Sequence, residues 1–137
     1  PYILMHMLGT PQNMQQNPKY EDITKEIIFF FAEQIEKLHQ LKVNDIIIDL
    51  GFGFGKTIDH NFEILKKLEL FKSLNTPILA GISRKSMLYK PLGISAQEAL
   101  NATTCANTIA LLNGATILRV HDVKEAMEAI KIVSRII

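Results

Sequence analysis

The sequence predicts an α/β fold made of four consecutive βα units, treated as one domain over residues 1–137. The first observation is a set of four short apolar runs without in-and-out alternation, which is typical of parallel strands covered on both faces. The second is that longer segments with helical spacing alternate with these runs. Four such units joined by right-handed crossovers form either an open doubly wound sheet or half of a closed barrel, and periodicity does not choose between them.

The four apolar runs are interpreted as strands. They cover residues 2–5, 46–48, 78–80 and 116–118. After the first run, the polar segment GTPQNMQQNP leads into a helix whose apolar residues recur every three or four positions. This helix has one apolar face, formed by Ile23, Ile27, Phe30, Phe31, Ile35, Leu38 and Leu41.

The later helices are predicted from signals at their ends. A helix starts near residues 60–61, after the second strand. Ser95 and Glu98 have the spacing of a capping box, and the helix that they open ends at residues 113–114, Asn-Gly. Asp122 is predicted to be the N-cap of the last helix, VKEAMEAIKIVSRII. The third helix buries a stripe of mostly small residues, namely Ala99, Ala102, Ala106, Ile109 and Ala110.

Length and composition indicate part of a larger domain. With 137 residues and 47% hydrophobic content, the chain can form one core. A complete eight-stranded α/β barrel needs roughly 250 residues, about twice as many. The chain also starts inside the strand-like segment PYILMHM without an initiator Met, so we expect a fragment.

The charge balance excludes several classes of partner. A net charge of +1 gives no overall field for nucleic acid or for an acidic membrane surface, so neither partner is expected. The longest apolar run, residues 27–32, is far shorter than the roughly 20 residues that a bilayer requires. Cys105 has no second cysteine to pair with and is expected to be an inert small hydrophobe in its helix. A reducing, cytoplasmic location is therefore predicted.

The segment IIIDLGFGFGKT, residues 46–57, looks like a phosphate-binding loop without matching one. Its glycine spacing is one residue too short for a Walker loop, and the pattern GxGxxG fails because Lys takes the place of the last Gly. Asp49 either caps a turn or accepts two N–H donors from the edge of a flat heterocycle. In the second interpretation, Phe52 and Phe54 project between the glycines and one of them stacks on the ring.

The predicted strand ends carry the candidate ligand-binding residues. They are His6, Asp49, residues 83–86 and residues 119–121. In both open sheets and barrels, ligands bind where strands end and helices begin. His6, His39 and His60 are too far apart for a zinc-binding spacing, so no metal site is predicted.

Four segments resemble the dihydropteroate synthase family, enzymes of folate synthesis that join a dihydropterin to 4-aminobenzoate. They are LMHMLGTPQNMQ at 4–15, DLGFGFGKTIDHN at 49–61, GISRKSML at 81–88 and RVHDV at 119–123. The resemblance covers essentially the whole chain and implies the C-terminal half, strands five to eight, of a TIM (β/α)8 barrel. Leu50 stands where the family usually has Pro, and Leu8 where it often has Gln or Arg.

The resemblance implies a role for each strand-end residue. Asp49 binds the amino and ring N–H edge of the pterin, and Lys85 contacts its carbonyl side near the 4-aminobenzoate ring. Arg119 and His121 bind the diphosphate, and with Lys85 they are the implied catalytic residues. Ser86 receives the carboxylate of 4-aminobenzoate. The implied substrate-binding set is Met5, Asp49, Gly53, Phe54, Gly81, Lys85, Ser86, Arg119 and His121.

Structural alternatives to these roles remain open. Lys85 could be a solvated lysine in a basic run, and Met5 could serve core packing. Arg119 could pair with a neighbouring acid, and His121 could cap the last helix.

The implied reaction is a transfer in which the amine of 4-aminobenzoate displaces diphosphate from the methylene carbon of a dihydropterin diphosphate. It requires no covalent nucleophile, because holding the ring and assisting diphosphate departure suffice. The resemblance also implies that Mg2+ binds together with the diphosphate. It further implies that the enzyme is a target of sulfonamides. The protein ligand of the metal belongs to the missing half, so the chain alone is expected to be inactive or nearly so.

Two other functions stay open. One is a pterin-binding barrel of the methyltransferase type, against which the segments SRKS and RVHDV argue because they serve 4-aminobenzoate and diphosphate. The other is a non-catalytic ligand-binding module. A half barrel also leaves inner side chains and two sheet edges uncovered, so a homodimer or other self-association is expected.

Overall fold

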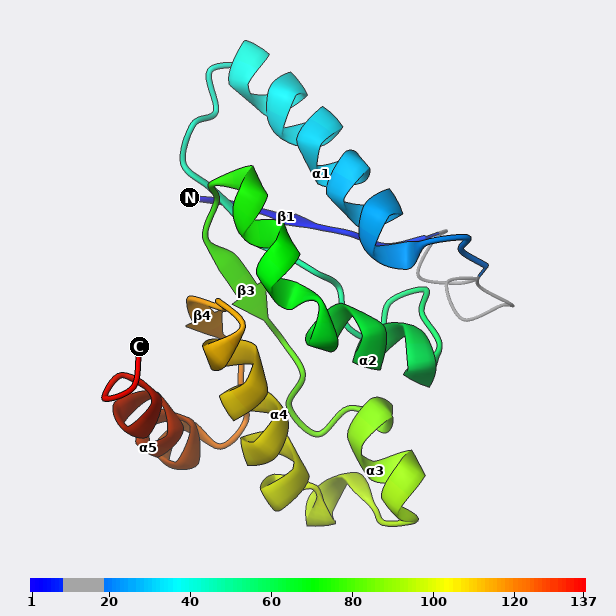
Figure 1. Cartoon of the computed structure of the whole chain (residues 1–137), viewed down its shortest axis with the longest axis vertical. Coiled ribbons are helices and arrows are strands. Elements are labelled where there is room, and N and C mark those ends of the chain that lie inside the picture. The colour runs from blue at the N-terminus through cyan, green and yellow to red at the C-terminus, as the bar shows by residue number, and fades with distance from the viewer. Residues whose placement is uncertain (9–18) are drawn as a thin grey trace.

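The computed structural model describes residues 1–8 and 19–137, which contain a four-stranded parallel sheet. Its strands are β1 (Tyr2–Met5), β2 (Ile46–Asp49), β3 (Ile78–Ala80) and β4 (Ile117–Leu118). The helices are α1 (Ile23–Gln40), α2 (Ile58–Lys66), η1 (Leu68–Leu74), α3 (Ser86–Leu92), η2 (Ala96–Glu98), α4 (Leu100–Leu112) and α5 (Val123–Val133). The predicted α/β fold of four βα units is confirmed (Figure 1).

The order of the strands explains where the helices lie. The strands neighbour one another in chain order, β1-β2-β3-β4, so each crossover joins adjacent strands. Because such crossovers are right-handed, successive helices cover the same face of the sheet. The main core forms there: Leu4, Ile48 and Ala80 from the strands share one cluster with Phe31 of α1 and Ile64 of α2.

The opposite face of the sheet is only partly covered. Ile3 is 52% exposed although it lies within β1. The register pairs Met5 with Asp49 and Asp49 with Leu79, so these three side chains share that face. The prediction that the strands are covered on both faces is wrong for β1, because the described helices pack against the other side.

The surface of α4 differs from its prediction. The capping box at residues 95–98 forms, but the short helix η2 follows it before α4 begins. Ala106 and Ala110 are buried as predicted, whereas Ile109 is 45% exposed and Cys105 is also exposed. The prediction of a buried Ile109 is wrong, because α4 turns this position away from the core; the exposure of Cys105 leaves its predicted inertness untested.

The last helix also differs in detail. α5 ends at Val133, not at the chain end. Asp122 occupies the N-cap position, but its carboxylate makes no capping hydrogen bond and instead pairs with Arg84. None of the described helices combines the length and the hydropathy that crossing a bilayer requires.

Candidate active site

Four side chains predicted from the strand ends lie at the carboxyl edge of the sheet. Asp49 ends β2, Lys85 follows β3, and Arg119 and His121 follow β4. Arg119 continues the pairing of the sheet, because its backbone N–H donates to the Ala80 carbonyl over 3.1 Å. A pocket of about 160 Å3 is lined by Gly81, Ser83, Lys85, Arg119, Val120 and His121. Lys85, Arg119 and His121 therefore share one pocket. Asp49 contacts this pocket through its ion pair with Arg119.

Asp49 is the acid of this site and is only 1% exposed. Its Oδ1 accepts a hydrogen bond from the Gly51 backbone N–H over 2.9 Å, which is the turn-capping alternative. Its Oδ2 lies 3.2 Å from the Arg119 guanidinium but accepts no hydrogen bond from any described residue. The carboxylate thus keeps an unused acceptor position for an N–H donor.

Gly81 allows the ion pair between Asp49 and Arg119 to form. A Cβ at Gly81 would lie 2.7 Å from an Arg119 guanidinium nitrogen, closer than carbon and nitrogen atoms can approach. The absence of a side chain therefore lets the guanidinium cross over β3 to reach the acid at the end of β2. Arg119 itself remains 53% exposed in its side chain, so an anion can also reach it.

The glycine loop after β2 is held by Lys56. Gly51, Gly53 and Gly55 have positive φ angles of 67°, 81° and 65°, which side chains adopt only with strain. The Lys56 ammonium is turned inward and donates to the carbonyls of His6, Gly51 and Phe54 over 3.3, 3.0 and 2.9 Å. Lys56 therefore ties the loop to the end of β1.

Sequence reasoning missed this role of Lys56 because it tested the residue only as a phosphate-binding lysine. The side chain is 3% exposed, and its three donor positions face three carbonyls. Burial lowers the pKa of Lys56 to about 7, while Asp49 acts in the opposite direction and Lys85 lowers it further. Asn61 was missed as well: its Oδ1 accepts from the Gly53 N–H over 2.9 Å and joins the loop to α2.

Lys85 lies over the glycine loop. Its ammonium donates to the Phe52 carbonyl and stands 4.9 Å from the centroid of the Phe54 ring, in cation–π range. Burial lowers the pKa of Lys85 to about 8, Asp49 opposes this shift and Arg119 adds to it. Phe54 is half-buried beside the ammonium, but Phe52 is fully buried, so the prediction that both rings project from the loop is wrong for Phe52.

Other predicted residues lie around this centre. Ser86 is the first residue of α3 and is half-buried, and Met5 ends β1 beside Asp49 in the register. Leu50, where the family usually has Pro, is fully buried in the core. Leu8 is 43% exposed, and its backbone packs against Gly55. Residues 9–15 of the first matching segment lie outside the described residues.

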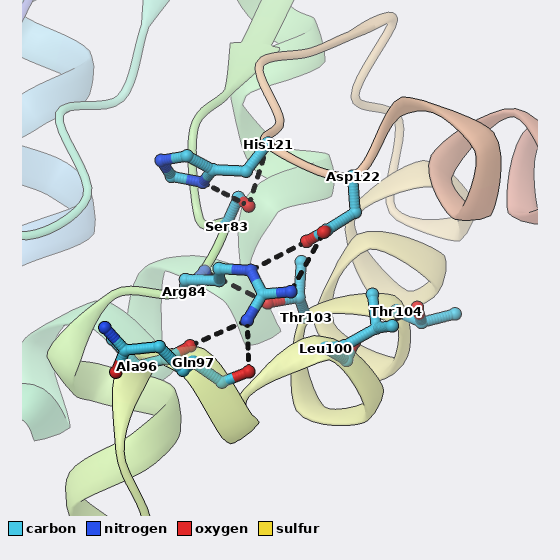
Figure 2. Close-up of polar contacts among 9 residues, drawn as sticks. All are labelled: Ser83, Arg84, Ala96, Gln97, Leu100, Thr103, Thr104, His121 and Asp122. Carbon is cyan, nitrogen blue, oxygen red and sulfur yellow. Dashed lines mark hydrogen bonds and ion pairs between the residues drawn. The ribbon is translucent and has the colours of Figure 1, made fainter.

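A polar network joins the loops that follow β3 and β4 (Figure 2). The Arg84 guanidinium donates to both carboxylate oxygens of Asp122 over 2.9 Å each, and to the carbonyls of Ala96 and Gln97. The Ser83 hydroxyl lies 2.8 Å from His121 Nδ1. His121 is therefore held by the loop after β3. The alternative prediction, that His121 caps α5, is wrong, because Asp122 occupies the N-cap position.

His6 at the end of β1 is a buried neutral group. It is 6% exposed, its ring centroid lies 5.0 Å from that of Phe30, and its Nδ1 has no hydrogen-bond partner among the described residues. Burial lowers the pKa of His6 to about 3, and the Lys56 charge lowers it further.

Acid should destabilise the chain through His6. Its pKa is 6.5 when unfolded and about 3 when folded, so between these values the unfolded chain binds more protons. The free energy of unfolding is therefore expected to fall as pH decreases from 6.5 to 3, by as much as about 5 kcal/mol from this group. Urea unfolding followed by circular dichroism should show this slope in the wild type and a weaker one in His6→Phe. The exposed His39→Gln control should keep the wild-type slope, and parallel curves for wild type and His6→Phe would contradict the assignment.

The described residues do not form a magnesium site. No group of three or more His, Cys, Asp and Glu side chains among residues 1–8 and 19–137 could hold a metal ion. Asp49, the acid that contacts the pocket residue Arg119, belongs to no such group of possible metal ligands in the described part of the chain. No step of the chemistry is therefore assigned to a metal held by these residues.

Comparison with known proteins identifies the family. Residues 1–121 match the pterin binding enzyme family. Dihydropteroate synthase of Escherichia coli strain K12 is 43% identical over 135 residues, which are 97% of this chain and 48% of that protein. The structure of Yersinia pestis dihydropteroate synthase with a sulfonamide drug complex has a TM-score of 0.95 at 40% identity, covering 98% of this chain and 50% of that one.

A more distant structure gives the same result. Dihydropteroate synthase from Thermus thermophilus in complex with 4-aminobenzoate has a TM-score of 0.91 at 30% identity, covering 97% of this chain and 55% of that one. The chain thus spans about half the length of the relatives that it matches. Because the family match takes in all four strands and every strand-end residue gathered at the pocket, this chain belongs to the family of pterin-binding enzymes.

Proposed function

We propose that this chain is the C-terminal half, strands five to eight, of the TIM (β/α)8 barrel of a dihydropteroate synthase. The whole enzyme condenses a dihydropterin diphosphate with 4-aminobenzoate to give dihydropteroate and diphosphate. The observation that carries the proposal is the buried Asp49 carboxylate paired with Arg119 at the wall of the pocket that also holds Lys85 and His121. One carboxylate and three basic side chains at the same edge of the sheet would suit the two ends of one substrate.

The acid suits the pterin end of that substrate. Asp49 Oδ2 has an unused acceptor position, and a pterin edge offers an amino group and a ring N–H side by side. Met5 lies beside Asp49 in the register, and Gly53 packs against the Lys85 side chain, which would reach the carbonyl side of the ring. A charge-assisted pair of hydrogen bonds to a buried carboxylate discriminates strongly against rings that lack both donors.

The cations suit the diphosphate end. Arg119 is half-exposed, so its guanidinium can bind diphosphate oxygens while Asp49 takes the pterin donors. His121 lines the same pocket and adds a hydrogen-bond donor. Together with Lys85 they would stabilise the negative charge that the diphosphate gains as its bond to the methylene carbon breaks. Mg2+ bound with the diphosphate would take its protein ligand from outside this chain.

4-Aminobenzoate would bind between the glycine loop and α3. Ser86 opens α3 with a hydroxyl, and no side chain caps this end of the helix, so a carboxylate could bind there; Phe54 beside Lys85 offers an apolar wall for the ring. Its amine then attacks the pterin methylene carbon without any covalent enzyme intermediate. Holding both rings in line is the contribution of this half of the site.

Calorimetric titration tests the proposal. The chain should bind a dihydropterin diphosphate and should bind 4-aminobenzoate more weakly, and mixing all three should give no turnover comparable to a full-length enzyme. Absence of pterin binding would contradict the proposal and favour a module without a pocket. Tight binding of a methylated folate in place of the diphosphate would favour a methyltransferase-type barrel.

Self-association is the second part of the proposal. Ile3, on the partly covered face of the sheet, and the neighbouring Tyr2 are about half exposed, and β1 and β4 are edge strands. We expect sedimentation to give the mass of a dimer or larger species for the chain, and a monomer at all concentrations would refute this. A cytoplasmic location is also proposed, and it is supported by the charge balance and the single cysteine.

A further inference from the structure

Two hydrogen bonds connect Ser83 to the same histidine. The Ser83 hydroxyl lies 2.8 Å from His121 Nδ1, and the His121 backbone N–H donates to that hydroxyl over 3.2 Å. Both residues lie in loops at the carboxyl edge of the sheet, one after β3 and one after β4. Figure 2 shows that the second ring nitrogen, Nε2, lies on the side of the imidazole away from Ser83.

The Ser83 hydroxyl has a single hydrogen to donate, and the acceptor of this hydrogen bears on which nitrogen of His121 is protonated. Ser83 is 5% exposed, so its single O–H should have an acceptor within the protein. The backbone N–H of His121 can only donate, so it uses a lone pair of the hydroxyl. Among the described residues, the acceptor left for the O–H is His121 Nδ1. If the O–H donates to Nδ1, a neutral ring must carry its proton on Nε2.

A second contact keeps the two loops in this arrangement. Arg84 follows Ser83, and Asp122 follows His121. The side chains of Arg84 and Asp122 form a bidentate ion pair with both N···O distances at 2.9 Å. The Arg84 backbone N–H donates to Thr103 Oγ1 of α4 over 3.0 Å, and its φ of 54° is fixed in the left-handed region. These contacts involve no ligand, so the orientation of His121 is set before anything binds.

We infer that Ser83 is a positioning residue that holds neutral His121 as the Nε2–H tautomer and presents this N–H to an anion in the pocket shared with Arg119 and Lys85. The assignment of the tautomer stands on the hydrogen bonds alone. The identity of the anion as a diphosphate rests on the proposed function. A neutral imidazole can then donate to the leaving group without first being protonated, while Arg119 supplies the charge.

The ring state can be measured in the free chain. Long-range proton–nitrogen correlation spectra of the histidine-labelled chain report which ring nitrogen is protonated, with His121 identified by its loss in His121→Gln. His60 is an internal reference, because its Nδ1 accepts from the Thr57 backbone N–H and must leave the proton on Nε2. A single Nε2–H form of His121 supports the inference, and an Nδ1–H form or a mixture of tautomers overturns it.

Variants separate positioning from folding. Ser83→Ala should give a mixture of tautomers at His121 with His60 unchanged, and should weaken binding of inorganic diphosphate by about fivefold, the equivalent of one hydrogen bond. Ser83→Thr, which keeps the hydroxyl, should restore both readouts, and the exposed Ser73→Ala should match the wild type. Unchanged spectra and affinity in Ser83→Ala overturn the role of Ser83. The spectra need no ligand, so they test the tautomer of His121 independently of the proposed function. The tautomer inference can therefore be contradicted while pterin binding at Asp49 is observed, and it can be supported while pterin binding is absent.

Discussion

Asp49→Asn is expected to weaken binding of a dihydropterin by about a hundredfold or more, because each hydrogen bond to a charged group contributes about 1.5–3 kcal/mol. The two N–H donors of the pterin edge would face one amide oxygen and an NH2 group that is itself a donor. The substitution also removes the partner of the Arg119 guanidinium. Fluorescence or calorimetric titration of the chain with a dihydropterin measures the change.

This substitution leaves the turn intact, so a loss of binding cannot be assigned to a collapsed loop. Asparagine keeps an oxygen at the position of Oδ1, which accepts from the Gly51 N–H. Asp45→Asn is the matched control: this acid is 80% exposed in its side chain and pairs with the amino terminus of the chain. The control should bind like the wild type. Affinity of Asp49→Asn within twofold of wild type would show that the acid does not hold the pterin.

The location of the site could be predicted because the carboxyl ends of parallel strands lie at the same edge of a sheet. Once four apolar runs are read as neighbouring strands, Asp49, Lys85 and Arg119 must lie at one edge, whatever their side chains contact. The choice between the two alternatives for Asp49 could not be predicted. The structure shows the turn cap, since Oδ1 accepts from the Gly51 N–H, while Oδ2 beside Arg119 accepts no hydrogen bond from a described residue, so binding of a heterocycle edge stays a prediction.

The supporting contacts could not be predicted because they join distant residues through side-chain direction. Arg84 and Asp122 are 38 positions apart, and nothing in the local pattern distinguishes a cap on α5 from a partner for a guanidinium. Lys56 follows a glycine loop, where a solvated or phosphate-binding lysine is the ordinary expectation. Its burial depends on the carbonyl of His6, 50 positions away. Similarly, the exposure of Ile109 depends on how α4 rotates against its neighbours.

Gly51→Ala is expected to cost more than about 4 kcal/mol of unfolding free energy, a loss in the range that marks overpacking and backbone strain together. Gly51 has a φ of 67°, and an added Cβ would lie 1.9 Å from the His6 carbonyl oxygen and 3.1 Å from the Lys56 ammonium. Neither neighbour can retreat easily, because the carbonyl belongs to the end of β1 and Lys56 donates to it. Urea unfolding at neutral pH measures the loss.

Gly93→Ala separates the two causes. Gly93 caps α3 with a φ of 64°, nearly the same backbone conformation, but an added Cβ would meet no heavy atom within 4 Å. It should therefore cost only the left-handed strain of about 1 kcal/mol, partly offset by reduced freedom of the unfolded chain. Equal losses at both positions would mean that strain alone selects glycine at 51. A much larger loss at Gly51 would mean that the loop needs glycine there because the His6 carbonyl and the Lys56 ammonium leave no room for a side chain.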